Sequence, residues 1–285
     1  MKHMTIQNVT EACHGTFHGN VPFLEQEIQG VAIDSRKIKP GYLFVPIKGA
    51  KVDGHTFIPQ VMENGALVTL AEHPLEDGPH PYILVDSCEQ ALKDIAAFYR
   101  NALDIKVVGI TGSVGKTSTK ETIASVLSQK YNVLKTEGNF NNEIGLPLTI
   151  FNIREEHEVA VLEMGIDHFG EMHRLASISQ PDICVITNIG LAHMENLGSR
   201  DGILKAKTEP EVFSSRYFTI TGQYRDTPEP AATPLRTGRL PDTTTAPRGT
   251  ITRPSALRGT KSPVVASKMA VELVIITPEA MTAFS

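Results

Sequence analysis

Cysteine is scarce in this chain of 285 residues, and its three cysteines lie far apart. Cys13, Cys88 and Cys184 form no C-x-x-C pair, which argues against a thiolate zinc site or a disulfide framework and favours reduced thiols. The sequence has no run of about 18 apolar residues, so we expect no membrane span. Its first residues also have no apolar segment of signal-peptide length. These absences together predict a cytoplasmic protein.

Strong net charge is also absent. The formal net charge is −5, and 41% hydrophobic with 21% charged residues is ordinary for a soluble globular protein. This charge gives no reason to expect nucleic-acid binding. The length is sufficient for two domains with separate cores, and we expect a monomer.

The composition changes near residue 210. Residues 1–209 contain 13 lysines and 5 arginines, whereas residues 210–285 contain 2 lysines and 7 arginines. Nine of the 18 prolines also fall in this last segment. We therefore expect residues 210–285 to be a tail unrelated to the rest of the chain and disordered, with 264–277 its only segment suited to order.

Strand-like apolar runs alternate with helix-like periodic segments before residue 209. Two short strands are expected at 66–70 and 82–86, followed by a helix that begins with capping-box spacing at Ser87 and Gln90. A hinge near 102–105 divides an N-terminal domain, 1–103, from a second domain, 104–209. In the second domain we expect strands at 106–111, 132–135, 158–165 and 182–190. Helices are expected after the glycine loop as far as Tyr131, within 145–153 with a start near Pro147, and at 170–178. This alternation indicates an α/β fold with a parallel sheet, whose ligands gather at the carboxyl ends of the strands.

Residues 109–120, GITGSVGKTSTK, are typical of a phosphate-binding loop between a strand and a helix. The usual spacing, G-x-x-x-x-G-K-[ST], would require glycine where this chain has Ile110. Lys116 would reach the phosphates of a nucleotide and Thr117 would ligate Mg²⁺. The alternative is a glycine turn with a solvated lysine. The expected ATP-binding residues are Thr111, Gly112, Ser113, Val114, Gly115, Lys116, Thr117 and Ser118.

Two further strand ends supply candidate metal ligands. Glu163 closes the strand VAVLE, and a carboxylate at the mouth of a buried strand suits Mg²⁺, which prefers hard oxygen ligands. His193 lies just beyond the strand VITNIG, where it could ligate a second cation or simply cap a helix. The residues themselves favour the helix cap.

Two polar loops are candidate substrate-binding regions. Asn139, Asn141 and Asn142 cluster before an apolar helix, either as a tight turn or as a polar loop over the γ-phosphate. In the N-terminal part, Ser35 and Arg36 follow a short apolar stretch. Composition alone permits only a polar ligand surface there.

The order of these segments resembles that of the Mur ligases, the ATP-dependent amide ligases of bacterial peptidoglycan synthesis. The resemblance covers about residues 30–209 and rests on DSRKIKPGYLFVPIKG, DGHTFI, TGSVGKTSTKE, GNFNNEIGLPLT, LEMGIDHFGEM, PDICVITNIGLAHMENLGS and ILKAKTE. The family's loop has the form TG-x-x-GKT, which accounts for Ile110. The stretches GNFNNEIGLPLT and LEMGIDHFGEM favour the member that joins D-alanyl-D-alanine to UDP-MurNAc-tripeptide.

The resemblance implies that ATP phosphorylates the tripeptide carboxylate and that the dipeptide amine attacks the acyl phosphate. It implies that Thr117 and Glu163 hold one Mg²⁺ and that His193 helps to hold a second. Asn141 or Asn142 would lie near the transferred group, with Asn142 the catalytic candidate and Asn141 the substrate-binding one. The resemblance places Ser35 and Arg36 in the uridine-nucleotide region. It also implies a lysine carbamylated by CO₂, for which Lys207 is the best match and Lys205 the fallback.

The resemblance ends after KTE at 207–209, where the family would continue with the rest of the ATPase sheet and a C-terminal domain. We therefore expect a truncated second domain with an exposed sheet edge, and negligible ligase activity from the chain. Our hypothesis for the tail is an out-of-frame or misassembled extension, with a natural linker as the alternative. Alternative functions are another ligase of the superfamily, of the MurE or folylpolyglutamate synthase type, or a non-catalytic nucleotide-binding module.

Overall fold

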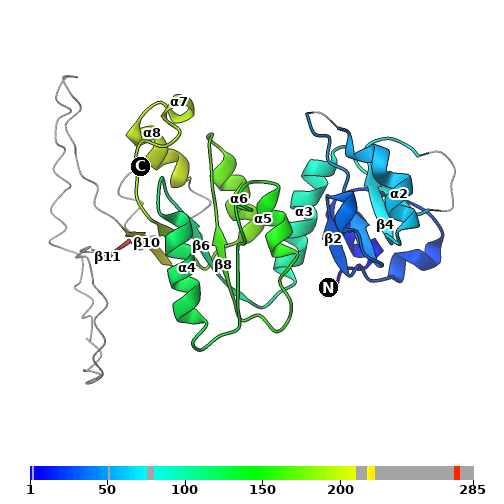
Figure 1. The fold of residues 1–285 in the computed structure, drawn as a ribbon, viewed down its shortest axis with the longest axis horizontal. Coiled ribbons are helices and arrows are strands. Elements are labelled where there is room, and N and C mark those ends of the chain that lie inside the picture. Colours follow the sequence, from blue (N-terminus) through cyan, green and yellow to red (C-terminus); the bar gives the residue numbers. More distant parts are fainter. Residues whose placement is uncertain (2, 51, 76–79, 210–216, 222–272, 277–285) are drawn as a thin grey trace. The chain divides into compact units, whose positions relative to one another are not determined.

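The structure is a computed structural model that describes residues 1, 3–50, 52–75, 80–209, 217–221 and 273–276 (Figure 1). All of the described residues belong to one unit of the chain, and they form two sheets with flanking helices. The helices, including three short 3₁₀ helices labelled η, are α1 Ile6–Ala12, η1 Val21–Glu25, η2 Ser35–Lys37, η3 Gly54–Phe57, α2 Ile58–Glu63, α3 Cys88–Asn101, α4 Lys116–Leu127, α5 Gly145–Ile150, α6 Glu171–Ser179, α7 Met194–Leu197 and α8 Arg200–Lys207. The strands are β1 Thr16–His18, β2 Gly30–Ala32, β3 Tyr42–Phe44, β4 Val68–Ala71, β5 Tyr82–Leu84, β6 Lys106–Thr111, β7 Val133–Lys135, β8 Val159–Glu163, β9 Ile183–Ile186, β10 Tyr217–Thr221 and β11 Leu273–Ile276.

The first sheet has the strand order β1-β5-β4-β3-β2. The pairs β2–β3, β3–β4 and β4–β5 are parallel, and β1 pairs antiparallel with β5. Both strands expected in this region are present as β4 and β5, although β4 begins two residues later than predicted.

Helix α3 leaves the first sheet and leads to the second. It begins where the capping residues predicted it, because the Ser87 side chain accepts a hydrogen bond from the Gln90 backbone N–H at 3.3 Å. The Gln90 side chain does not complete a capping box, since it donates to Asp94 at 2.8 Å. Further along, the hydroxyl of Tyr99 donates to the Ile153 carbonyl at 2.6 Å, so that α3 is fixed to the segment after α5.

The second sheet has the order β11-β10-β9-β6-β8-β7, and its strands from β7 to β10 are parallel. The predicted α/β fold is confirmed. Successive residues of a strand face opposite sides of the sheet, so Val107 packs in the core shared with α3, α5 and α6, whereas Val108 packs in the core under α4. The sheet is therefore covered on both faces.

Several elements of the second domain differ from their predicted bounds, among them α4, which ends at Leu127, and β8, which ends at Glu163. Helix α5 begins at Gly145, two residues before Pro147, because the Asn142 side chain caps it at that point. Strand β9 ends at Ile186, whereas the sequence predicted a strand to residue 190. The backbone of residues 187–190 instead turns to contact the glycine loop.

The segment after residue 209 contributes two strands. Strand β10 pairs parallel with β9, and β11 pairs antiparallel with β10. Strand β9 is therefore covered by β10, and the edge of the sheet on this side lies at β11. The β-branched and aromatic residues in YFTIT suit a strand. Strand β11 falls within the tail segment expected to be suited to order. Strand β10 lies in the part of the tail expected to be disordered, so that expectation is wrong for residues 217–221. The remainder of the tail lies outside the described residues. None of the helices in the described part combines the length and apolarity needed to cross a membrane.

Candidate functional site

The glycine loop between β6 and α4 has the backbone conformation that its two glycines allow. Gly112 has φ +138° and Gly115 has φ +82°, both in the region that favours glycine. A Cβ atom on Gly112 would lie only 2.0 Å from Oγ1 of Thr187, so a larger residue cannot fit there. The Nζ of Lys116 donates to the Gly112 carbonyl at 3.0 Å.

The loop is braced by the segment that follows β9. The Thr187 hydroxyl donates to the Val114 carbonyl at 2.6 Å, and the Asn188 side chain accepts from the Val114 N–H at 3.0 Å. The hydroxyl of Ser113 accepts from the Gly190 N–H at 2.9 Å. Thr187 and Asn188 were not predicted from the sequence, where the available signal was a pair of polar residues directly after an apolar strand.

The predicted ATP-binding residues divide into two groups. The hydroxyl of Ser113 already accepts the hydrogen bond from Gly190. Lys116, Thr117 and Ser118 instead lie in the first turn of α4, where Thr117 and Ser118 are exposed. Thr111 is buried at the end of β6, and its hydroxyl has no hydrogen-bond partner among the described residues. The free N-terminus of α4 and this unpartnered hydroxyl fit a ligand with phosphate oxygens.

Thr117, Glu163 and Asn141 meet at the mouth of the loop. Oγ1 of Thr117 donates to Oε2 of Glu163 at 3.0 Å, and the Asn141 amide donates to Oε1 of the same carboxylate at 2.9 Å. Glu163 is only 2% exposed, so its carboxylate is held by these partners rather than by solvent. The structure thus brings together residues from α4, β8 and the loop after β7.

Asn142 has a different place in the fold. Its side chain accepts hydrogen bonds from the backbone N–H groups of Gly145 at 2.8 Å and Ile144 at 3.3 Å. These contacts give hydrogen-bond acceptors to backbone N–H groups at the start of α5, as a helix cap does. Asn141, rather than Asn142, is the asparagine that contacts Glu163.

His193 contacts an acidic residue on another loop. It has φ +64° at the N-terminus of α7, and its Nδ1 lies 3.0 Å from Oδ1 of Asp167. Asp167 follows β8 by a few residues and is exposed. The described residues contain no group of three or more histidine, cysteine, aspartate or glutamate side chains that could hold a metal ion. A metal at this site would therefore need oxygen ligands from Thr117, Glu163 and a bound nucleotide, which is the ligand set that Mg²⁺ accepts.

The two candidate lysines of α8 differ in their environment. Lys207 is 1% exposed, whereas Lys205 is exposed. Burial, together with the positive charge of Lys116, lowers the pKa of Lys207 to about 8, while the charges of Asp167 and Glu171 act in the opposite direction. A larger fraction of Lys207 than of an ordinary lysine is therefore neutral near neutral pH.

Ser35 and Arg36 lie on η2 in the first sheet's part of the chain. The Arg36 guanidinium makes a two-pronged hydrogen bond to Asp34, at 2.9 and 2.8 Å. This contact lowers the pKa of the Asp34 carboxyl to about 2. Arg36 is exposed, so it presents a charged group to solvent.

A buried lysine that was not predicted from the sequence lies close to Glu163. Lys120, in α4, is 1% exposed and donates to the Thr136 carbonyl at 2.6 Å. Its Nζ is 3.9 Å from Oε2 of Glu163. In the sequence it resembles any solvated helix lysine, and only the approach of β7 and β8 buries it.

A cysteine, a histidine and an aspartate also come together in the first sheet's part of the chain. Nδ1 of His55 lies 2.7 Å from Asp53, and its Nε2 lies 3.9 Å from Sγ of Cys88. Nucleophilic catalysis is not supported, because burial raises the pKa of the Cys88 thiol and the thiol is fully buried. His55 Nε2 already accepts the Glu72 N–H at 3.1 Å. The group is a structural link between η3, β4 and α3.

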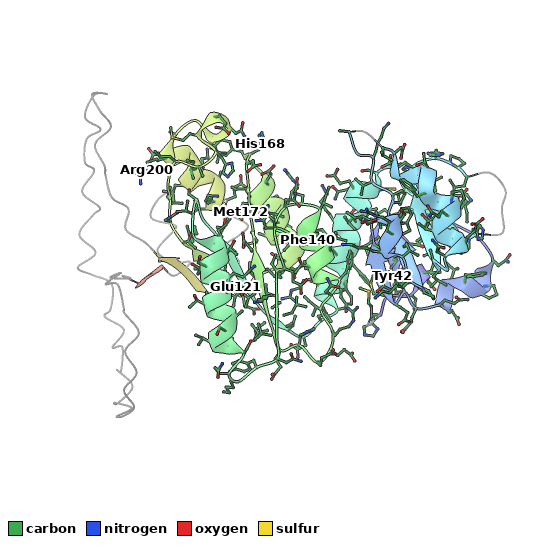
Figure 2. The ribbon with its side chains drawn as sticks, viewed as in Figure 1. Tyr42, Glu121, Phe140, His168, Met172 and Arg200 are labelled. Atoms are coloured by element: carbon green, nitrogen blue, oxygen red, sulfur yellow. The ribbon has the colours of Figure 1, made fainter. Side chains whose placement is uncertain are left out.

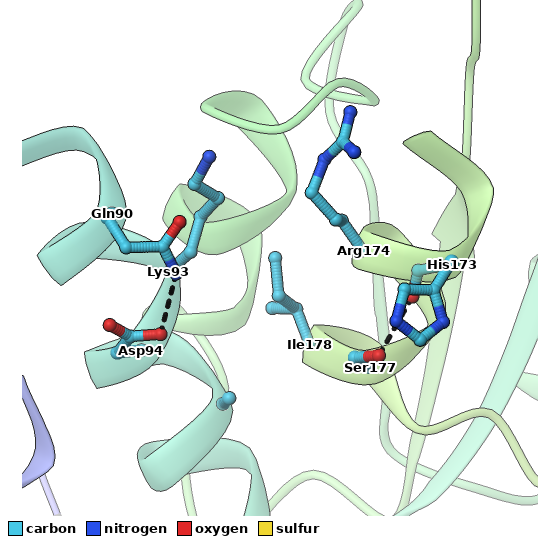
Figure 3. Close-up of a pocket in the computed structure, with 8 residues that line it drawn as sticks. Gln90, Lys93, Asp94, His173, Arg174, Ser177 and Ile178 are labelled. Carbon is cyan, nitrogen blue, oxygen red and sulfur yellow. Dashed lines mark hydrogen bonds between the residues drawn. The ribbon is translucent and has the colours of Figure 1, made fainter. Parts of the chain in front are cut away.

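A pocket between α3 and α6 contains none of the predicted site residues. Gln90 donates to Asp94 and the Ser177 hydroxyl donates to the His173 carbonyl within its lining, as Figure 3 shows. The two cations at its rim, Lys93 and Arg174, both pair with Glu143. Their charges are therefore balanced, and the pocket offers no clear ligand chemistry.

Two family models and a set of curated relatives match the sequence of this chain. The family model described as Mur ligase family, catalytic domain, matches residues 27–100, and the one described as Mur ligase middle domain matches residues 110–213. The UDP-N-acetylmuramoyl-tripeptide--D-alanyl-D-alanine ligase of Bacillus subtilis is 46% identical over 207 residues, which are 72% of this chain and 45% of that protein. The chain thus spans about 45% of the length of this curated relative.

The structure of this chain also aligns with solved structures of MurF. A crystal structure of MurF from Acinetobacter baumannii aligns with a TM-score of 0.65 at 37% identity, covering 74% of this chain and 46% of that one. The MurF ligase of Thermotoga maritima in complex with ADP aligns with a TM-score of 0.60 at 38% identity, covering 65% and 42%.

Proposed function

Because the chain belongs to the Mur ligase family, we propose that it is part of an ATP-dependent ligase that joins D-alanyl-D-alanine to UDP-MurNAc-tripeptide. The relative from Bacillus subtilis carries this activity in its name. The proposed binding of ATP rests on the contact between Thr117 and Glu163 at the mouth of the glycine loop. Nucleotide binding is the part of this function that the described residues allow to be tested directly.

The proposed reaction transfers the γ-phosphoryl group of ATP to the C-terminal carboxylate of the tripeptide. The amine of D-alanyl-D-alanine then forms the new C–N bond at the acyl phosphate, phosphate leaves with the C–O electron pair, and the amine loses a proton. Catalysis of this kind depends on positioning and on neutralising phosphate charge. Mg²⁺, when bound, supplies part of that neutralisation.

We assign the side chains of the site as follows. Lys116 and the N–H groups of residues 111–118 hold the phosphates, and Thr117 and Glu163 hold Mg²⁺. Asn141 supports Glu163 and lies near the transferred group, because its amide contacts that carboxylate, whereas Asn142 begins α5. His193, oriented by Asp167, contributes to a second cation.

We propose that residues 1–103 bind the UDP-precursor, with Ser35 and Arg36 in the uridine-nucleotide region, and that residues 104–209 are part of the ATP-binding domain. The exposed guanidinium of Arg36 is suited to an anionic ligand. We further propose a cytoplasmic location and a monomeric protein. The absence of a membrane-spanning helix among the described residues is compatible with this location.

Lys207 is our candidate for carbamylation by CO₂. Its lowered pKa supplies the neutral amine, whose nitrogen forms a bond to the carbon of CO₂ and releases a proton. With ¹³C-bicarbonate we expect a carbamate signal by NMR in the chain and in Lys205→Arg, but not in Lys207→Arg. A signal that survives in Lys207→Arg would assign the modification elsewhere.

The nucleotide part can be tested on this chain by calorimetric titration with Mg²⁺ and ADP. We expect binding that Lys116→Ala abolishes and that the matched variant Lys130→Ala, on a lysine beyond the end of α4, retains. The ligation part needs a protein extended to the length of the relatives. In that protein, phosphate release should depend on D-alanyl-D-alanine. Release that depends on a diamino acid or on glutamate instead would favour another ligase of the superfamily.

A further inference from the structure

Lys120 and Glu163 form a buried pair of opposite charges beside the phosphate loop. Lys120 lies one helical turn after Thr117 on α4, so both side chains reach Oε2 of Glu163, Thr117 at 3.0 Å and Lys120 at 3.9 Å. The two charged residues are only 1% and 2% exposed. Charges buried to this extent are retained only when they are paired, and at this distance they interact strongly.

The remaining contacts fix the Lys120 ammonium in place. Its Nζ donates to the Thr136 carbonyl at 2.6 Å and also lies 3.3 Å from Glu121 on the helix surface. The Thr136 hydroxyl in turn accepts the Glu163 backbone N–H at 2.9 Å. Lys120 is therefore anchored to the strand end that carries the carboxylate, and it cannot swing away without breaking these bonds.

This pairing removes the net negative charge from the proposed metal site. Glu163 is the acidic residue in contact with Thr117. Lys120 lies between Glu163 and Glu121, and Glu121 is also paired with Lys135, so the two carboxylates are balanced by two lysines. Lys116 adds a further cation at the loop. A divalent cation binds where anionic oxygen ligands outweigh positive charge. The missing negative charge would come from the phosphates of a nucleotide.

We propose that Lys120 is a fixed counter-charge that prevents Glu163 from binding a free divalent cation and makes metal binding conditional on a nucleotide. Lys120 is thus a positioning residue that sets the order of binding. This inference rests on the proposed nucleotide site, but it concerns the metal affinity of the chain without nucleotide.

The test measures Mn²⁺ binding by electron paramagnetic resonance, with and without ADP. For the chain itself we expect no saturable binding of free Mn²⁺ at the loop and clear binding in the presence of ADP. Lys120→Met removes the charge, and Lys120→Gln also retains a donor for the Thr136 carbonyl. Either variant should bind free Mn²⁺ at least tenfold more tightly than the chain, and Glu163→Gln added to it should abolish the gain.

Lys135→Met is the matched control, because Lys135 also pairs with Glu121 but is not in contact with Glu163 in the described structure. It should leave free Mn²⁺ binding unchanged. The proposal is overturned if folded Lys120 variants bind free Mn²⁺ no better than the chain, or if the chain itself binds free Mn²⁺ as tightly as it does with ADP. The second comparison needs no variant to fold. Failure to bind ADP at all would count against the proposed function instead.

Discussion

The side-chain amide of Asn141 donates to Oε1 of Glu163 at 2.9 Å, although the two residues are 22 positions apart in the sequence. This bond joins the loop after β7 to the end of β8, beside the N-terminus of α4. In Figure 2, the label of Phe140 marks the loop that carries Asn141, and the label of Glu121 marks helix α4. The bond distinguishes two neighbouring asparagines that look equivalent in the sequence.

Asn141→Ala should lower the affinity for Mn²⁺ with ADP by roughly tenfold, because a hydrogen bond to a charged group is worth about 1.5 kcal/mol or more. Asn142→Ala should leave that affinity unchanged and lower the free energy of unfolding by about 1 kcal/mol, since it removes the cap of α5. Calorimetry and urea denaturation measure the two effects. The reverse pattern would mean that Asn142 is the site residue.

Gly112→Ala should destabilise the chain by at least about 2 kcal/mol, since its Cβ would collide with Thr187 and its backbone angle is strained for alanine. Gly198→Ala is the control, because Gly198 has φ +75° but no heavy atom within 4 Å of the added Cβ. Gly198→Ala should lower the free energy of unfolding by about 1 kcal/mol, which is the cost of the backbone angle alone. Equal costs in urea denaturation would show that the contact with Thr187 does not matter.

Arg100→Met should lower the free energy of unfolding by about 3 kcal/mol, because several buried carbonyls lose their donor. The Arg100 guanidinium donates to the carbonyls of Ser179, Leu103, Ile105 and Gln180, which join α3 to the end of α6 and the start of β6. Thermal denaturation of Arg36→Met provides a contrast, since the loss of this exposed ion pair should cost less than about 1 kcal/mol and lower the melting temperature far less. A similar loss for both variants would contradict the role of Arg100.

Lys207 should make the stability of the chain depend on pH. Its pKa is about 8 in the folded chain and near its ordinary value of 10.5 when unfolded, so the unfolded state binds more protons between these values. The free energy of unfolding should therefore rise from pH 8 to 10.5, by up to about 3 kcal/mol. In CO₂-free buffer, Lys207→Met should abolish this rise and Lys205→Met should retain it. A rise that is unchanged in Lys207→Met would refute the assignment.

The sequence predicted most of the second sheet because its strands are long apolar runs and its helices have clear periodicity. β6 has its predicted bounds of 106–111, and α3 begins at its predicted cap. The first sheet was harder to predict, since most of its strands have three residues and give too short a pattern to read.

The candidate site was predicted only in part, for a physical reason. Thr117 and Glu163 follow from the loop motif and from a carboxylate at a strand end. Lys120, Thr187 and Asn188 act through tertiary contacts. In the sequence Lys120 resembles a solvated helix lysine, and the polar pair Thr187 and Asn188 after an apolar strand does not show which loop it contacts. The preference for Asn141 over its neighbour likewise depends on where the loop folds back onto β8.

The braces of the glycine loop have a consequence for protein synthesis. They come from Thr187, Asn188 and Gly190, which lie 73 to 77 residues after the positions that they hold. A ribosome adds roughly 5–20 residues per second, so the loop emerges several seconds before its braces exist. During that interval Val114 and Ser113 lack their native partners, and a nascent chain should acquire a rigid phosphate loop only after β9 has been made.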